Sequence, residues 1–186
     1  MAVTPAGTPY VESSDNVADY PGVSLALANH IDGLDGGKVL QVVSVTKVDT
    51  FTTTSTSYVD ITGLSVAITP SATTSKILVF YKIALNTPDS GVARLQLVRG
   101  AVVIGGGTAV GNRASAMSSF FDQSSYSTTD LNGNFLDSPA TVSALTYKIQ
   151  GAIHSPPLTI NRTANDADVL QEARTSSTIT VLEISA

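Results

Sequence analysis

The segment K-I-L-V-F-Y-K-I-A-L at positions 76–85 constrains the fold of this chain more than any other stretch. Successive side chains of a β-strand point to opposite faces. As a strand, the segment places four apolar side chains on one face: Ile77, Val79, Tyr81 and Ile83. It places three on the other face: Leu78, Phe80 and Ala84. A strand that is covered on both faces is central in a fold or lies at a subunit interface, so Leu78 and Phe80 are candidates for an oligomer interface.

Apolar alternation with a period of two continues through most of the chain after residue 38. The other strand-like segments are 39–45, 58–62, 93–104, 142–150, 158–160 and 177–185. Segment 93–104 is long enough to be a hairpin that turns near Arg99 and Gly100. Turn-forming residues separate the strands at 62–63, 69–71, 88–91, 132–133 and 154–157. Short strands without intervening helices predict a mainly β fold, an antiparallel β-sandwich or jelly roll, over residues 38–186.

A row of hydroxyl side chains at 52–57 lies between two of these strands. So many hydroxyl groups could not all find hydrogen-bond partners in a core. The row therefore predicts an edge strand or a strand crossing at the surface. A Thr-rich edge with few charges lacks the usual protection against pairing with other chains, and a neighbouring subunit would supply that protection.

Residues 1–37 lack the β pattern and are predicted to form a separate segment. Residues 1–19 show no periodicity and contain prolines that favour an extended arm. Residues 20–36 are the only convincing helix, with an apolar stripe at heptad spacing: Leu27, Ile31 and Leu34. Each Leu or Ile left exposed forgoes about 1.5–3 kcal/mol of burial. The stripe packs either on its own domain or on copies of itself around a symmetry axis. We therefore predict an attachment arm and a short trimerising helix, with the stripe as a second set of interface candidates.

Composition excludes several classes of function. Only 13% of the residues are charged, and the formal net charge is −5. Nucleic acids and anionic membranes attract basic surfaces, so we expect neither as a partner. No stretch reaches the roughly 18 apolar residues of a membrane span. The chain has no cysteine for disulfides or thiolate metal sites, and its first residues lack the pattern of a signal peptide.

No motif in the sequence points to catalysis or to a cofactor. The glycines of 105–111 are not followed by a convincing helix, so they predict a flexible loop rather than a phosphate site. The segment D-L-N-G-N-F at 130–135 predicts a hairpin turn, and 165–168 predicts a solvated loop, with calcium binding as the alternative for each. The chain has two histidines, His30 and His154, which no motif joins to a nucleophile. We predict no catalytic, cofactor-binding or metal-binding residues and no enzyme activity.

The longest polar segment, 120–134, is the best candidate for ligand binding. Loops of aromatic, Ser and Asn residues on a rigid β scaffold are suited to binding glycans or proteins. The candidate residues in this segment are Tyr126, Asp130 and Asn132. An ordinary mobile loop is the alternative.

Several stretches of the chain resemble structural proteins of tailed bacteriophages, including phages of cyanobacteria and marine bacteria. The longest is 37–79, which begins G-K-V-L-Q-V-V-S-V and ends S-K-I-L-V. Two others are F-L-D-S-P-A-T-V-S-A-L-T-Y-K-I-Q at 135–150 and A-R-T-S-S-T-I-T-V-L-E-I-S-A at 173–186. The segment Y-P-G-V-S-L-A-L-A-N-H-I-D-G-L at 20–34 is similar to the docking helix that precedes the distal domain of many phage fibre proteins. The resemblance implies a trimeric β-domain of the jelly-roll kind found in tumour-necrosis-factor-like trimers, and no catalytic residues.

These observations predict a virion structural protein, a tail or head fibre-like appendage. Its arm would dock on capsid, portal or tail proteins, and its trimeric β-domain would bind a partner such as a host surface glycan. Two alternatives are a capsid decoration protein, whose sandwich clamps neighbouring capsid subunits, and a lectin-like module for host recognition. In each case we expect a protein that is made in the host cytoplasm and resides in the virion.

Overall fold

The computed structural model describes residues 2–3, 9–10, 38–88, 91–121, 124–155 and 157–185. The chain divides into two compact units, residues 39–184 and residues 1–38 with 185–186. In the smaller unit, β1 (Ala2–Val3) pairs antiparallel with β2 (Pro9–Tyr10). The helix predicted at 20–36 lies outside the described residues, and so do three interface candidates: Leu27, Ile31 and Leu34.

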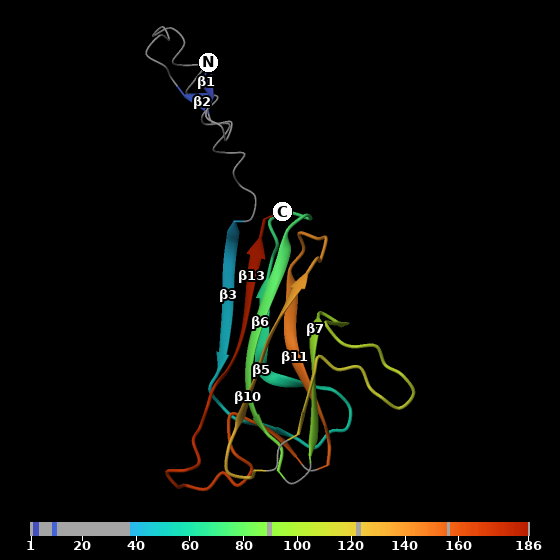
Figure 1. Ribbon diagram of the computed structural model, residues 1–186, viewed down its shortest axis with the longest axis vertical. Helices are drawn as coiled ribbons and strands as arrows, with labels where there is room; N and C mark the ends of the chain where they lie inside the picture. The colour runs from blue at the N-terminus through green and yellow to red at the C-terminus, as the bar shows by residue number, and fades with distance from the viewer. Residues whose placement is uncertain are drawn as a thin grey trace. The chain divides into compact units, whose positions relative to one another are not determined.

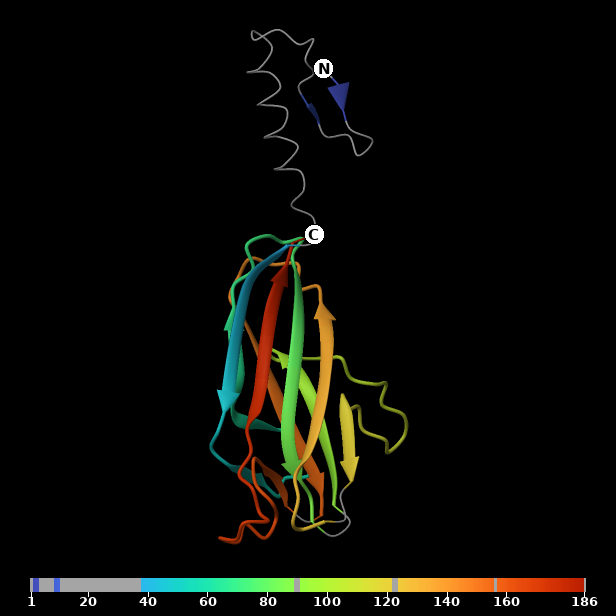
Figure 2. The same ribbon diagram turned by 60° about the vertical axis from the view of Figure 1, so that its left-hand side comes forward.

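The unit 39–184 is a β-sandwich of two antiparallel sheets, as the sequence predicted (Figure 1). The six-stranded sheet contains, in spatial order, β3 (Val39–Lys47), β13 (Ser177–Ile184), β6 (Lys76–Asn86), β12 (Leu158–Ile160) and β4 (Phe51–Thr53). In the same sheet, β10 (Thr129–Asp137) pairs with β6. Figure 2 shows β3, β13, β6 and β10 side by side as one layer.

The five-stranded sheet forms the second layer. Its strands, in spatial order, are β5 (Val59–Ile68), β11 (Leu145–His154), β7 (Val92–Arg99) and β8 (Val102–Ile104), with β9 (Ser118–Phe121) also paired to β7. The loop between β8 and β9 leaves the body of the sandwich (Figure 2). The predicted loop at 105–111 lies in it, and its residues are exposed.

The core lies between the inner faces of the two sheets. β6 is central, because β10 pairs along one side of it while β13, and beyond its end β12, pair along the other. Its alternation is confirmed: Ile77, Val79 and Ile83 are fully buried, and Leu78 and Phe80 point to the other face. The largest core side chains from the other strands are Ile61, Leu64, Leu95, Leu97, Tyr147, Ile149, Ile153, Leu158 and Ile160.

Two local predictions are confirmed. β7 and β8 form the predicted hairpin, in which Arg99 pairs with Val102 and Gly100 has a φ of 59° that favours glycine. The hydroxyl row at 52–57 contains both predicted features. Thr52 and Thr53 end the short edge strand β4, and the following residues cross from the six-stranded sheet to β5 in the five-stranded sheet.

The predicted turn at 62–63 is wrong. Gly63 has a φ of 86°, but it lies inside β5 rather than between strands. The register of β5 against β11 shifts between Lys148 and Gln150, which marks a β-bulge. Positive φ at glycine serves bulges as well as turns, and the local sequence does not distinguish the two.

The predicted turn at 132–133 is also wrong, because Asn132 and Gly133 lie in the middle of β10. Gly133 is the register partner of Tyr81 on β6. A Cβ atom added at Gly133 would lie 2.1 Å from the Tyr81 hydroxyl oxygen. The glycine therefore makes room for the tyrosine ring beneath an edge strand.

Candidate functional site

The outer face of the six-stranded sheet carries an apolar row that crosses four strands. Leu78 on β6 has Leu182 on β13 as its register partner on one side and Leu136 on β10 on the other. Leu182 in turn pairs with Val42 on β3. We call Val42, Leu182, Leu78 and Leu136 the apolar row. Its two ends are well exposed, at 58% for Val42 and 56% for Leu136, although both are apolar.

The neighbouring row on this face is uncharged. It contains Ser44, Thr180, Phe80 and Asn134, again in register across the four strands. The hydroxyl groups of Ser44 and Thr180 share a hydrogen bond of 2.7 Å. The Phe80 ring is 43% exposed, so it extends the apolar row along β6.

Charges on this face lie at the margins and have partners within the sheet. The Lys82 ammonium lies 3.3 Å from a carboxylate oxygen of Asp130. At the other end of β6, Lys76 donates a hydrogen bond of 3.0 Å to the hydroxyl of Ser138. A partner that covers the centre of the face would therefore meet apolar and neutral groups.

The outer face of the five-stranded sheet carries a polar network, beside apolar side chains such as Val103 and Phe121 that are 44% and 48% exposed. Asp60 on β5 accepts hydrogen bonds from Lys148 (2.8 Å) and Gln150 (2.6 Å) on β11. These two donors hold the pKa of Asp60 below its ordinary value. Gln96 on β7 donates to Gln150 and continues the network across the sheet. The Arg94 guanidinium lies 5.8 Å from the centre of the Tyr58 ring.

A network inside the sandwich joins the two sheets. Asp137, at the end of β10, accepts hydrogen bonds of 2.8 and 2.7 Å from the guanidinium of Arg99 on β7. It also accepts one of 2.6 Å from the hydroxyl of Tyr147 on β11. Burial and the neighbouring carboxylate raise the pKa of Tyr147, so its hydroxyl remains a donor at physiological pH.

Glu183 fixes the end of the six-stranded sheet. It is buried, and one carboxylate oxygen accepts hydrogen bonds of 2.7 Å from both the backbone N–H and the hydroxyl of Ser71. The other oxygen accepts one of 2.6 Å from Gln41 on β3. Burial raises the pKa of Glu183, but these hydrogen bonds outweigh it and lower the pKa to about 2.

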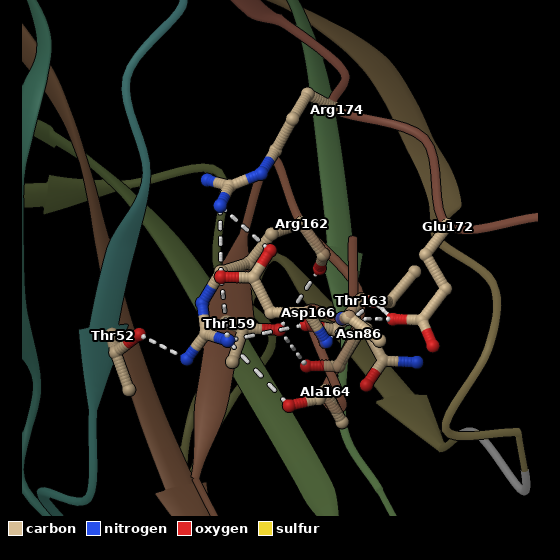
Figure 3. Close-up of polar contacts among 10 residues, drawn as sticks. Thr52, Asn86, Thr159, Arg162, Thr163, Ala164, Asp166, Glu172 and Arg174 are labelled. Carbon is tan, nitrogen blue, oxygen red and sulfur yellow. Dashed lines mark hydrogen bonds and ion pairs between the residues drawn. The ribbon is translucent and has the colours of Figure 1, made fainter. Parts of the chain in front are cut away.

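At the other end of the sandwich, charged and polar side chains organise the loop 161–176 (Figure 3). Asp166 lies between two guanidinium groups, at 3.5 Å from Arg162 and 2.8 Å from Arg174. Glu172 accepts hydrogen bonds from the hydroxyl of Thr163 and the backbone N–H of Ala167. The Thr163 hydroxyl is the main reason that the pKa of Glu172 is lowered.

This organised loop presents apolar side chains to solvent. Leu170 is 100% exposed and Val169 is 50% exposed. The adjacent loop contains Tyr126, which is 64% exposed, and the N–H of Asn165 donates to the carbonyl of Ser125 and so joins the two loops. We call residues 124–128 and 161–176 the loop end. The Asn161 side chain donates to the carbonyl of Lys47, which places the loop end opposite the start of β3.

The structure separates the residues predicted to bind ligand. Tyr126 lies in a loop between β9 and β10. The prediction that Asp130 and Asn132 lie in the same loop is wrong, because both belong to β10. Their partners across the sheet are Ala84 and Lys82, and the β-pattern of β10 was hidden by the Asn-Gly pair.

The interface candidates Leu78 and Phe80 lie together on the outer face of the six-stranded sheet. The sequence alone did not identify Val42, Leu136 or Leu182 as neighbours of Leu78 and Phe80. The alternation of 39–45 and 177–185 could have placed Val42 and Leu182 on one face of each strand. Only the register between strands shows that they align with Leu78.

Among the described residues, no group of three or more His, Asp or Glu side chains is arranged to hold a metal ion. His154 is exposed at the end of β11. In the same part of the chain, no helix has the length and apolar character needed to cross a membrane.

Comparisons with known proteins give a distant structural likeness only. No protein-family model and no curated protein matches the chain. Among solved structures, the chain is similar to a single-substitution variant of the VP2 protein of infectious bursal disease virus in derived T=1 particles, with 12% identity and a TM-score of 0.39. It is also similar to the VP2 subviral particle of the same virus, with 13% identity and a TM-score of 0.33. Each match covers 78% of this chain but only 36% and 38% of the VP2 chains. A likeness this weak does not bear on function.

Proposed function

We propose that the chain is a structural protein of a bacteriophage particle that acts by binding. The observation that carries the proposal is the apolar row on the outer face of the sandwich, whose ends Val42 and Leu136 are more than half exposed although the core is formed without them. Monomeric proteins rarely expose contiguous apolar surface of this kind unless a partner covers it. The resemblance of 37–79, 135–150 and 173–186 to phage structural proteins supports the same class.

Within that class, we propose a tail or head fibre-like appendage. Residues 1–37 would attach the protein to the particle and trimerise it. The sandwich would project, with the loop end at the tip, because the loop end lies opposite the point where the chain enters β3. The exposed side chains of Val169 and Leu170, on the loop that ion pairs of Asp166 hold in shape, and of Tyr126 on the adjacent loop would then meet the partner. Such preorganisation reduces the entropy lost on binding.

Antibody labelling of purified particles in the electron microscope tests this function. We expect label at discrete sites on the head or tail, and we expect the chain among the proteins of the purified particle. Pre-immune serum on the same particles is the control. A chain that occurs in infected cells but never in purified particles would contradict the proposed function.

Capsid decoration is the second candidate, and the apolar row on the outer face of the sandwich favours it. In that case the sandwich rather than the arm would contact the shell. Removing residues 1–37 distinguishes the two, with circular dichroism to check that the remaining chain is folded. An appendage held by its arm would lose particle binding, whereas a decoration protein would keep it.

A further inference from the structure

We propose that the outer face of the six-stranded sheet, centred on the apolar row, is the surface through which copies of this chain associate with each other. The inference deepens the proposed function and rests on it for the idea that copies of the chain assemble. What it adds is the position of the contact: the sheet face formed by β3, β13, β6 and β10. The predicted helix at 20–36 is not needed for this contact.

The first argument is that the core does not require apolar side chains at the outer positions of β6 and β13. The inner faces of β6 and β13 already fill the core, with Ile77, Val79, Ile179 and Val181 at 0% exposure. The outer positions of the same strands could be polar without any loss to the core. They nevertheless carry Leu78, Leu182 and Phe80. Apolar residues in such positions are expected where a second surface excludes water from them.

The second argument is area. The face is four strands wide, at about 4.8 Å per strand, and about nine residues long, at about 3.4 Å per residue. Its area is therefore roughly 600 Å². Two copies packed on this face would bury roughly 1,200 Å² in total, which is at the lower limit of specific protein interfaces. Two sheets can pack face to face in this way at a spacing of about 10 Å, as they do within a sandwich.

The third argument identifies the occupant as another copy. The chain has a net charge of −5, so two copies repel each other over most orientations. The centre of this face carries no charge, and the charges at its margin, Lys82 and Asp130, neutralise each other. A row of four aliphatic side chains also complements an identical row, so two copies can pair about a two-fold axis.

The polar groups next to the row support the same occupant. Ser44 and Thr180 satisfy each other by a hydrogen bond, and Lys76 donates to Ser138. A second copy could therefore cover this face without breaking these hydrogen bonds. A partner that recognised the face by charge would find no free charge at its centre.

Sedimentation velocity of the full chain over a range of micromolar concentrations tests the proposal. The informative variant is Val42→Lys with Leu136→Lys, because both side chains are more than half exposed and lie at the ends of the row. We expect the wild type to associate. We expect the variant to have a dissociation constant at least about a hundredfold higher, because two buried aliphatic contacts become two charges.

The matched control is Ser65→Lys with Thr146→Lys, which adds the same charge to the outer face of the five-stranded sheet at two exposed positions. This control should associate like the wild type. Three results would overturn the proposal: a wild type that stays monomeric, a variant that associates like the wild type, or a control that loses association equally. The second of these would place the contact elsewhere, for example on residues 1–37.

A labelling experiment covers the case in which the lysine variant does not fold. The chain has no native cysteine, so Asn134→Cys offers a single site for a fluorophore beside the apolar row, and Ser65→Cys offers the control site. We expect the emission at position 134 to shift to the blue as concentration rises, and the emission at position 65 to stay constant. Emission that is independent of concentration at both sites would overturn the proposal. Neither experiment uses virus particles, so a failure here is distinct from a failure to find the chain in virions.

Discussion

The outer faces of the two sheets differ far more than their inner faces do. Both inner faces are aliphatic and close-packed, with side chains such as Val79 on one sheet and Leu97 on the other fully buried. On the outside, the five-stranded sheet carries the hydrogen-bonded network of Asp60, Lys148 and Gln150. The six-stranded sheet carries the apolar row across β3, β13, β6 and β10. The centre of one outer face is therefore a polar network, and the centre of the other is apolar.

This difference shows that core formation and surface function are separate demands on the same strands. A sheet with one solvated face normally alternates apolar and polar residues, and the five-stranded sheet follows that rule on β5 and β11 but not at Val103 and Phe121 on its edge strands. The six-stranded sheet departs from it at Leu78, Phe80 and Leu182, which lie on its two central strands. A departure from the rule without benefit to the fold points to a partner. The predictions below test the contrast, in order of decreasing effect.

The largest loss of stability is expected from removing Asp137, the carboxylate that links the two sheets through hydrogen bonds. Asp137→Ala leaves the buried Tyr147 hydroxyl and the Arg99 guanidinium without their shared acceptor. Removing one member of a buried ion pair typically costs about 3–5 kcal/mol. We expect a loss of that size in the free energy of unfolding, measured by urea denaturation.

Asp60→Ala on the polar outer face is the matched variant. Its partner Lys148 is partly exposed, with 24% of the side chain accessible, and Asp60 is more open still. Exposed ion pairs contribute about 1 kcal/mol or less. Equal losses for the two aspartates would mean that the outer network stabilises the fold as strongly as the internal one, and the contrast between faces would need revision.

A smaller loss in the free energy of unfolding is expected from Gly133→Ala. The added Cβ atom would lie 2.1 Å from the Tyr81 hydroxyl oxygen, so the ring or strand β10 must move. Overpacking of this kind costs about 1–3 kcal/mol. Gly107→Ala is the control, because nothing lies within 4 Å of its added Cβ atom. Thermal unfolding should show a lower midpoint for the first variant only, and an unchanged midpoint would mean that β10 is loosely held.

Much of this architecture follows from the sequence because alternation is a local property. The two-sided apolar pattern of 76–85 predicted a central strand, and β6 is central. The hairpin at Arg99 and Gly100 followed from a break between two apolar runs. In these cases the residues that carry the signal are adjacent in sequence, so no knowledge of other strands is needed.

The remainder depends on pairing between distant segments. Asn132-Gly133 reads as a turn locally, yet Tyr81 requires a glycine at that place in a strand. Gly63 reads as a turn, yet it serves a bulge. The apolar row needs the register of four strands, and its paired residues Val42 and Leu182 are 140 residues apart in sequence. The ion pairs of Asp166 at the loop end likewise arise from contacts that no short motif records.

Acid should weaken the six-stranded sheet through Glu183. Its pKa falls from 4.5 to about 2 on folding, so the folded state favours the carboxylate. The resulting stabilisation is fully present above the unfolded pKa and is lost as pH falls through about 2. Urea denaturation at pH 7, 4 and 2.5 should show this loss in the wild type.

Glu183→Gln isolates the contribution of that carboxylate. The variant should be less stable than the wild type at pH 7, because a neutral amide accepts weaker hydrogen bonds from Ser71 and Gln41 than a carboxylate does. The difference between the two proteins should shrink toward pH 2.5. A constant difference across this range would show that the titration of Glu183 does not stabilise the sheet.

The smallest effect is expected on the apolar row itself, provided that the protein is dilute. Val42 and Val43 are neighbours on β3, but Val42 lies on the outer face at 58% exposure while Val43 packs against the core. Val43→Thr puts a hydroxyl group against the core and should cost about 1–3 kcal/mol. Val42→Thr should change the free energy of unfolding by less than about 0.5 kcal/mol at nanomolar concentration, because the fold does not use that side chain.

At micromolar concentration the same Val42→Thr substitution should lower the unfolding midpoint, because association stabilises the folded state of the wild type. A large loss in dilute solution would instead make the apolar row part of the fold, and the outer faces of the two sheets would then differ for a structural reason rather than a functional one.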